Sequence, residues 1–312
     1  MSALQWRDWS CTVRVVLADG LAASEPPQSR AAARVEALLR CLMDDVARSA
    51  SRFRSDSDLS RVNLAAGRLV PVRTLTLELV EVALAAARDT DGACDPTIGR
   101  HLLAAGYDAD IDVVRTRRAH PTDREWPTGI RPAADWTAVR VDRELGRIGV
   151  PAGLALDLGA TAKAWTADEA AARLARALGV PALVALGGDV AASGSGPEWP
   201  LLVSEHEGGS GEVIGLVGGG IATSSTRGRR WATSTGEAHH LIDPRTGAPV
   251  DGPYRCATVL ADTCADANAL STAALVWGDE ALERLAPHAA RLVERSGRVV
   301  TTAGWPGEDV AA

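Results

Sequence analysis

Residues 157–163, Asp-Leu-Gly-Ala-Thr-Ala-Lys, place a carboxylate, a glycine and a lysine at the expected start of a helix. The N-terminus of a helix offers free N–H groups and the positive end of the helix dipole, and both suit a phosphate. Lys163 would add a full positive charge to such a site. The same residues also fit a plain helix start, with Asp157 as the cap and Lys163 in solvent. Taken alone, the segment favours neither interpretation.

Residues 239–247 combine groups for proton transfer with groups for anion binding. His239, His240, Asp243 and Arg245 lie within seven residues of one another. Histidine changes its charge near neutral pH, and the arginine fork matches the oxygens of a phosphate. A polar turn after a strand would explain the proline and glycine of this segment but not the pair of histidines. The segment therefore predicts a functional site.

Residues 264–272 begin a predicted helix that carries oxygen-bearing side chains. Asn268 and Thr272 are four residues apart, so their side chains share one face of that helix. Amide and hydroxyl oxygens suit a hard cation such as Mg²⁺. Asp266 or Asn268 could equally serve as a plain helix cap with no metal. On this segment alone, the cap is the preferred interpretation.

Two shorter segments place glycines beside an aspartate. Residues 92–97, Gly-Ala-Cys-Asp-Pro-Thr, follow the end of a predicted helix, and residues 186–189, Leu-Gly-Gly-Asp, end a predicted buried strand. Glycine admits either the close approach of a ligand or a tight turn. For residues 92–97 taken alone, the ordinary turn is the preferred interpretation, whereas residues 186–189 favour neither a binding site nor a turn.

The elements that must position these segments mix strands and helices without a regular βαβ repeat, which predicts an α+β fold rather than a doubly wound sheet. Hydrophobic spacing at a helical period predicts the helix over 30–49, and β-branched alternation predicts the strand over 11–17. The polar residues 51–59 are expected to pack against nothing, and residues 119–136 are expected to form a surface excursion. Further expected elements are helices over 75–88, 161–178, 265–277 and 279–290, strands over 154–156 and 183–186, and hairpins over 138–150 and around 296–297.

Composition limits the classes of function. The 312 residues carry 33 Lys and Arg against 40 Asp and Glu, a net charge of −7, so nothing in the charge favours nucleic acid as a partner. No run reaches the roughly 18 apolar residues of a membrane span. The five cysteines form no CxxC pair, which disfavours a disulfide framework and a zinc site. Phosphate-loop, dinucleotide-binding, zinc-protease and nucleophile-elbow motifs are also absent from the sequence.

Taken together and in this order, the segments resemble the ApbE family, the FAD:protein FMN transferases. The resemblance covers roughly residues 10–280 and is most specific at 157–163 and 239–247. It implies an α+β fold related to the T-fold, with mixed sheets and packed helices in one compact, two-lobed unit over residues 1–312. The matching residues are 51–53, 57–59, 63, 92–99, 157–168, 186–189, 223–224, 239–247 and 265–278.

The resemblance also implies an activity and a set of site residues. The family cleaves the pyrophosphate of FAD and transfers FMN, through a phosphodiester, to a Thr or Ser of an acceptor protein, with release of AMP and with Mg²⁺ at the pyrophosphate. His240 and Lys163 take the catalytic positions. The FAD positions are Phe53, Ala93, Cys94, Asp95, Asp157, Lys163 and Ile242, and the metal positions are the Ala160 carbonyl, Asn268, Ser271 and Thr272, with Asp266 as a further candidate.

The chain departs from the family pattern at several of these positions. Asn268 replaces the usual metal-binding aspartate and brings no charge, so metal affinity is expected to fall unless Asp266 compensates. Cys94 replaces a phenylalanine and removes an aromatic wall. Smaller departures are Ala160 and Ala164 in place of glycines, and Ser225 and Thr226 in place of Gly-Asp.

Three functions compete on the sequence. The transferase is the first, an Mg²⁺-dependent FAD pyrophosphatase that yields FMN and AMP is the second, and a non-catalytic flavin-binding protein is the third. The joint presence of His240, Lys163, Asp157 and Thr272 argues against the binder, because binding alone needs no proton acceptor. Many relatives are exported lipoproteins, but no signal peptide or lipobox is visible here, so the expected location is the cytoplasm.

Overall fold

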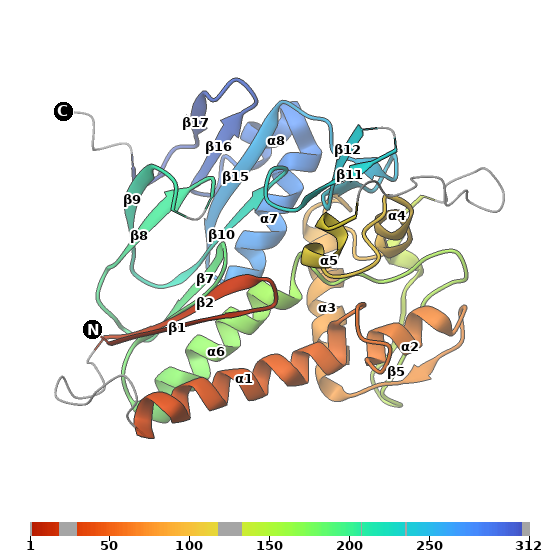
Figure 1. Ribbon diagram of the computed structural model, residues 1–312, viewed down its shortest axis with the longest axis horizontal. Coiled ribbons are helices and arrows are strands. Elements are labelled where there is room, and N and C mark those ends of the chain that lie inside the picture. Colours follow the sequence, from red (N-terminus) through yellow and green to blue (C-terminus); the bar gives the residue numbers. More distant parts are fainter. Residues whose placement is uncertain (1, 19–29, 118–132, 207, 235, 308–312) are drawn as a thin grey trace.

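The centre of the molecule is an eight-stranded sheet in which every neighbouring pair of strands is antiparallel (Figure 1). The computed structural model describes residues 2–18, 30–117, 133–206, 208–234 and 236–307. In spatial order the strands are β1 (Ser2–Asp8), β2 (Cys11–Leu17), β6 (Ala182–Leu186), β7 (Asp189–Ser193), β10 (Gly219–Ser225), β15 (Tyr254–Ala261), β16 (Ala290–Glu294) and β17 (Val299–Thr301).

Two helices cover one face of this sheet. α6 (Ala162–Leu178) packs against β6 and β7, and α7 (Cys264–Trp277) packs against β10 and β15. α7 approaches so closely that a Cβ at Gly220 of β10 would overlap the backbone of Cys264. The first turn of α7 therefore lies directly against the sheet.

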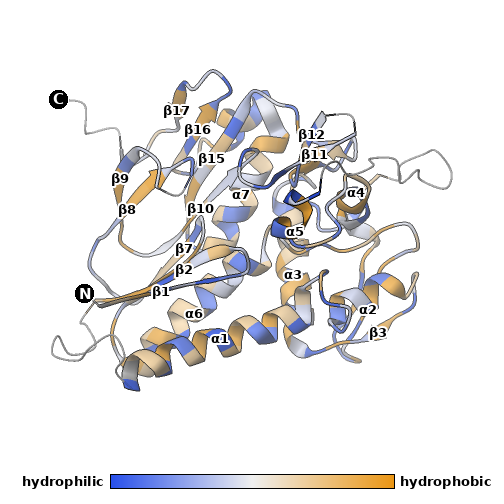
Figure 2. Cartoon of the chain, viewed as in Figure 1, coloured by the Kyte–Doolittle hydropathy of each residue, from blue (hydrophilic) through white to orange (hydrophobic). Residues whose placement is uncertain are grey.

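Two further helices form a second layer behind α6. α1 (Arg30–Ala50) packs against α6, and α3 (Thr74–Asp89) packs against α1. Most of the apolar positions predicted for α1 are buried at 3% exposure or less, among them Leu39 and Leu42, while most of its charged positions face outward. Figure 2 shows both kinds of residue alternating along this helix. The burial of this stripe stabilises the frame that carries α6.

The opposite face of the sheet is covered in part by a hairpin of β8 (Trp199–Ser204) and β9 (Gly211–Leu216). Trp199 and Ile214 of the hairpin belong to one buried cluster with Leu183 and Ile221 of the sheet. Alternate residues of the same strands, such as Val184, belong to the core beneath α6. The central strands are thus apolar on both faces, as their short continuous hydrophobic runs indicate.

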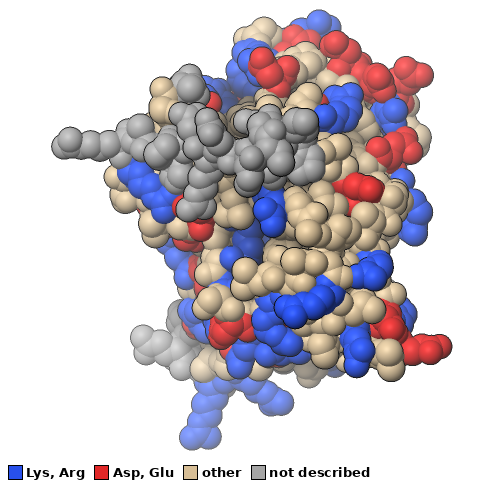
Figure 3. All heavy atoms as spheres, turned by 90° about the vertical axis from the view of Figure 1, so that its right-hand side faces the viewer, with Lys and Arg blue, Asp and Glu red and all other residues tan. Residues whose placement is uncertain are grey.

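Most of the smaller elements gather beside this sandwich, on the right in Figure 1. Seen from that side in Figure 3, the surface carries both basic and acidic side chains. The elements not yet given are α2 (Asp58–Leu64), β3 (Val70–Pro71), α4 (Gly99–Ala104), α5 (Ile111–Arg115), η1 (Trp136–Ala138), β4 (Arg140–Asp142), β5 (Arg147–Gly149), β11 (Arg230–Thr233), β12 (Gly236–His239), β13 (Ile242–Asp243), β14 (Ala248–Pro249), η2 (Gly278–Glu280) and α8 (Ala281–Arg284).

The antiparallel sheet with packed helices confirms the predicted α+β class, and most predicted elements are present. Gly179 ends α6 with a positive φ of 69°, as expected for a glycine after the last turn. Among the described helices, none is both long and apolar enough to cross a membrane. The predicted surface excursion lies mostly in 118–132, outside the described residues.

Three local predictions are wrong. The helix expected over 279–290 reduces to η2 and α8, because Pro287 has no N–H to continue it and β16 begins at Ala290. The strand expected over 154–156 makes one isolated bridge, from Ala155 to Ile98. Residues 51–59 do pack: Asp58 is 1% exposed and accepts hydrogen bonds from Arg73 N at 2.8 Å and Thr76 Oγ1 at 2.9 Å.

Candidate functional site

A pocket of about 700 Å³ lies where the loop between β6 and β7, the first turn of α6 and the start of α7 meet. Its walls also include residues 93–96 and 240–242, so segments far apart in the chain share one cavity. Eleven of the predicted site residues line it: Phe53, Ala93, Cys94, Asp95, Asp157, Ala160, Lys163, His240, Ile242, Asn268 and Thr272.

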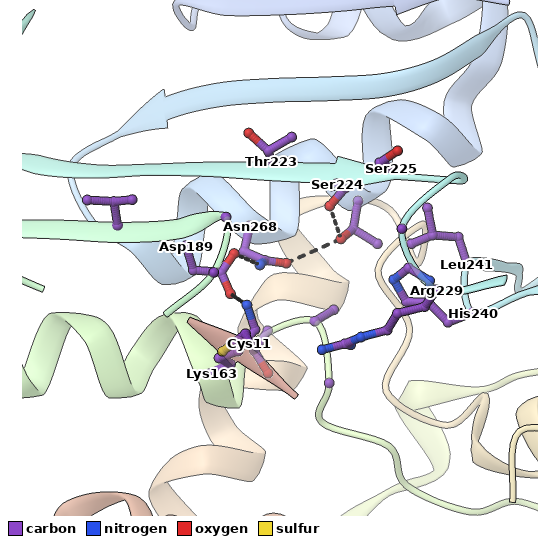
Figure 4. Close-up of a pocket in the computed structure, with 18 of the residues that line it drawn as sticks. Cys11, Lys163, Asp189, Thr223, Ser224, Ser225, Arg229, His240, Leu241 and Asn268 are labelled. Atoms are coloured by element: carbon purple, nitrogen blue, oxygen red, sulfur yellow. Dashed lines mark hydrogen bonds and ion pairs between the residues drawn. The ribbon is translucent and has the colours of Figure 1, made fainter. Parts of the chain in front are cut away.

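Three charged or polar side chains form the innermost cluster of this pocket (Figure 4). The Lys163 ammonium pairs with the carboxylate of Asp189, whose side chain is 2% exposed, and donates to the Leu186 carbonyl at 2.8 Å. The other oxygen of Asp189 accepts a hydrogen bond from the Asn268 amide nitrogen at 2.6 Å. The carboxylate thus joins the first turn of α6 to the second turn of α7.

α7 contributes an amide and a hydroxyl oxygen to the pocket beside this cluster. The Asn268 Oδ1 accepts a hydrogen bond from Thr272 Oγ1 at 3.3 Å, which places both side chains on one face as their spacing predicts. Thr272 and Ser271 each bond to the Ser224 hydroxyl, at 3.0 and 2.9 Å. Ser271 is fully buried and does not line the pocket, so its hydroxyl supports β10 from behind.

The structure does not bring Asp266 to the pocket. Its side chain is exposed, and its carboxylate accepts a hydrogen bond from Thr263 Oγ1 at 2.7 Å while its backbone N–H donates to the same hydroxyl. Asp266 is therefore part of the N-terminal cap of α7, as in the alternative interpretation of that segment, and it does not line the pocket that holds Asn268.

A hard cation fits part of this cluster. The amide oxygen of Asn268, the hydroxyl of Thr272 and the carboxylate of Asp189 are the donors that Mg²⁺ and similar ions prefer, and all three residues line the same pocket. Ala160 lies on the facing loop. Within the described ranges, no group of three or more His, Cys, Asp or Glu side chains is arranged to hold a metal. A bound cation would therefore be coordinated mainly by neutral oxygens.

A second wall of the pocket is built around Arg52. Its guanidinium donates to Asp157 Oδ2 and to the Tyr107 carbonyl, both at 2.5 Å, and lies over the rings of Phe53 and Tyr107 at 4.2 and 4.5 Å. Tyr107 stacks in turn on Trp231. Phe53 remains 43% exposed, so its ring is available to a planar ligand. Phe53 and Tyr107 thus give this side of the pocket two aromatic rings.

Asp157 also shapes its own loop. Its Oδ1 accepts a hydrogen bond from Gly159 N at 2.9 Å, which turns the chain before α6. The side-chain amide of Asn63 holds the preceding Leu156 through two hydrogen bonds, at 2.7 and 2.9 Å, as a neighbouring strand would. The loop that carries Ala160 is thus fixed from both sides.

Residues 94–97 form an ordered turn in the pocket wall. Asp95 Oδ1 accepts from Thr97 N and Thr97 Oγ1 at 2.7 and 2.6 Å, and Oδ2 accepts from Trp136 N at 3.1 Å. Burial raises the pKa of Asp95, and these hydrogen bonds act in the opposite direction. Burial also raises the pKa of the Cys94 thiol to about 12, so Cys94 is a small neutral wall residue rather than a nucleophile.

The two adjacent histidines have different surroundings. His239 Nε2 bonds to the Val250 carbonyl at 3.1 Å, and His239 does not line the pocket. His240 lines it, beside Arg229. Burial, followed by the charge of Arg229, lowers the pKa of His240 well below the ordinary value of 6.5. His240 is therefore a neutral imidazole at physiological pH, which is the form that accepts a proton.

Comparisons with known proteins identify the family of the chain. The family model described as the ApbE family matches residues 8–293. The chain belongs to the ApbE family. Solved structures of the family have the same fold: the ApbE protein of Thermotoga maritima aligns with a TM-score of 0.82 and 25% identity over 97% of each chain. The flavinyl transferase ApbE of Pseudomonas stutzeri aligns with a TM-score of 0.77 and 25% identity, over 97% of this chain and 95% of that one.

Curated ApbE relatives carry the name FAD:protein FMN transferase. The protein of Vibrio cholerae is 29% identical over 249 residues, which are 77% of this chain and 72% of the relative. The protein of Treponema pallidum is 30% identical over 258 residues, 74% of this chain and 67% of the relative. These names confirm the predicted enzyme class, a transferase.

Three residues of this ApbE site were not among the sequence predictions. The sequence does point to Asp189, because it follows a predicted buried strand and two glycines. The same segment also fits a plain turn. Arg52 precedes the predicted Phe53, but its contacts with Asp157 and Tyr107 span 105 and 55 residues. Arg229 lies in an arginine-rich loop where nothing in the spacing distinguishes it from its neighbours.

Proposed function

We propose that this protein is a Mg²⁺-dependent FAD:protein FMN transferase, with residues 1–312 acting as one domain. It would cleave the pyrophosphate of FAD, attach FMN through a phosphodiester to a Thr or Ser of an acceptor protein, and release AMP. The observation that carries the proposal is the joint placement of a neutral His240, the Lys163–Asp189 pair and the oxygens of Asn268 and Thr272 in one pocket.

The pocket offers separate places for the parts of FAD. The exposed ring of Phe53, backed by Arg52 and Tyr107, suits a planar ring system, because aromatic and guanidinium faces both stack on such rings. Lys163 and the first turn of α6 suit the pyrophosphate. Asp95, Cys94 and Ile242 also line this pocket.

The metal would rest on Asn268, Thr272 and the Ala160 carbonyl, with the Asp189 carboxylate beside them. When bound, Mg²⁺ supplies a positive charge that stabilises negative charge on the phosphoryl oxygens. Lys163 adds a fixed positive charge nearby, held in place by Asp189 and the Leu186 carbonyl. Both groups act on charge that grows in the transition state, where electrostatic stabilisation is most effective.

His240 would take the proton of the acceptor hydroxyl. The hydroxyl oxygen attacks the phosphorus of the FMN half, the bond from that phosphorus to the bridging oxygen breaks, and AMP leaves with the electron pair. The proton moves from the hydroxyl to the imidazole of His240. A histidine whose pKa is lowered by burial is unprotonated before this step and is therefore ready to accept.

The test is the intact mass of an FMN-acceptor domain after incubation with the protein, FAD and Mg²⁺, with AMP followed in parallel. A gain equal to FMN less water, which depends on the metal and is lost in His240→Ala, supports the transferase. AMP and free FMN with an unmodified acceptor would indicate FAD hydrolysis instead. FAD binding without AMP would indicate a flavin-binding protein.

A further inference from the structure

Arg229 lies opposite His240 at the base of the β11–β12 hairpin. Arg230 pairs with His239 in that hairpin, and one step further the His240 N–H donates to the Arg229 carbonyl at 3.3 Å. Residues directly opposite in an antiparallel pair project their side chains to the same face. Figure 4 shows both side chains at the pocket, with the guanidinium of Arg229 extending toward the side that holds Lys163.

The guanidinium of Arg229 forms no ion pair with an acidic side chain among the described residues. Each acidic side chain that lines the pocket already has partners: Asp189 pairs with Lys163, Asp157 with Arg52 and Glu205 with Arg255, and Asp95 accepts three hydrogen bonds. Within the described part of the chain, no ion pair or hydrogen bond joins the guanidinium of Arg229 to another residue. The charge of Arg229 is thus free for a ligand.

A second group on the opposite wall also lacks a partner. The hydroxyl of Thr161, which precedes the first turn of α6, is buried, lines the pocket and makes no hydrogen bond within the described residues. The following N–H groups of α6 begin a helix of 17 residues. A buried hydroxyl and the positive end of a helix dipole favour an anion between them and the guanidinium.

We propose that Arg229 is a further binding residue for the diphosphate group, with its guanidinium donating to phosphate oxygens from the side opposite Lys163 and α6. The proposal rests on the function proposed above and assigns the ligand contact to this one residue of the arginine-rich loop. The arginine fork can donate two hydrogen bonds to one phosphate, which a lysine cannot match. The same contact would bring the phosphorus next to His240.

Equilibrium binding to three probes tests this assignment. FAD and ADP both contain a diphosphate, whereas riboflavin contains none. We expect Arg229→Gln to weaken FAD and ADP about 10- to 100-fold, the range for hydrogen bonds to a charged group, and to leave riboflavin unchanged. Arg229→Lys should bind FAD and ADP with affinities between those of wild type and Arg229→Gln. Arg227→Gln is the matched control, because Arg227 is exposed, lies two residues away and does not line the pocket.

Each outcome decides the assignment. Equal FAD and ADP affinities in wild type and Arg229→Gln would overturn it, and so would an equal loss for riboflavin or for Arg227→Gln. Thermal unfolding of each variant excludes a folding defect as the cause. If wild type binds ADP but not FAD, the proposed function fails while the ADP comparison still tests Arg229. If wild type binds no diphosphate, both proposals are overturned.

Discussion

The amide nitrogen of Asn268 lies 2.6 Å from the carboxylate of Asp189, which is almost completely buried. This hydrogen bond fixes the orientation of the amide: its nitrogen faces Asp189 and its oxygen faces Thr272. An aspartate at position 268 would place two carboxylates in contact. The asparagine instead donates to Asp189, whose other oxygen pairs with Lys163, and the amide oxygen stays available at the pocket.

The first prediction concerns Asn268→Asp. Without metal, the new carboxylate repels Asp189, so the free energy of unfolding should fall by about 1–3 kcal/mol. With Mg²⁺, the added charge should tighten metal binding and restore stability, if Asn268 is a ligand. Thermal unfolding across a Mg²⁺ titration measures both effects. Asp266→Asn, on the same helix but exposed, should change neither the stability without metal nor the response to Mg²⁺. If the response of Asn268→Asp to Mg²⁺ were no stronger than that of wild type, the metal would bind elsewhere.

The second prediction concerns the buried pair of Lys163 and Asp189. Lys163→Met leaves the Asp189 carboxylate without its cation, and breaking a buried pair in this way should cost about 3–5 kcal/mol of unfolding free energy. The double change with Asp189→Asn removes both charges and should recover part of the loss. Urea unfolding of the two single variants and the double variant gives the coupling energy. If the loss of unfolding free energy in the double variant equalled the sum of the losses in the two single variants, the two side chains would not interact.

The third prediction concerns the pH dependence of transfer. The lowered pKa of His240 keeps the imidazole neutral as the pH falls through 6.5, where an ordinary histidine is half protonated. Because the neutral form accepts the proton, the single-turnover rate should stay level through pH 6.5 and fall only in more acid solution. His240→Ala should abolish transfer while FAD still binds. A rate that halves near pH 6.5 would contradict the buried, neutral state of His240.

Sequence reasoning predicted those parts of the site whose partners lie close in the chain. The four-residue spacing of Asn268 and Thr272 placed them correctly on one face of α7, and the glycine after α6 correctly marked its end. Burial of residues 57–59 was missed, because Asp58 is held by Arg73 and Thr76 from the next helix. A polar run gives no sign of a partner that lies 15 or more residues away.

Two further features of the site also depend on contacts between distant segments. Asp266 and Asn268 both suited a metal or a cap by residue type, and only the packing of α7 against β10 decides which of them faces the pocket. The role of Arg52 could not be predicted from the sequence for the same reason. Its side chain acts on Asp157 and Tyr107, which the fold brings to it from distant segments. Resemblance to a family supplied the positions that local patterns left open.

The last prediction concerns Arg52, whose guanidinium joins both halves of the second wall. Its side chain is 8% exposed, pairs with Asp157 and covers the rings of Phe53 and Tyr107. Arg52→Ala should lower the free energy of unfolding by about 3 kcal/mol and weaken FAD binding, because Asp157 loses its cation and Phe53 its support. Arg52→Lys keeps the charge but cannot donate to Asp157 and to Tyr107 at the same time as the guanidinium does. It should therefore recover only part of the stability and part of the FAD affinity.

Arg54→Ala is the matched control, two residues away, because Arg54 is exposed and pairs only with exposed acids among the described residues. Its stability and its FAD affinity should both match wild type, since exposed pairs contribute little. Chemical unfolding and flavin fluorescence measure the two quantities on the same preparations. If Arg52→Ala behaved like Arg54→Ala in both, the wall formed by Phe53, Tyr107 and Asp157 would stand without Arg52, and its assignment as the organising residue would be wrong.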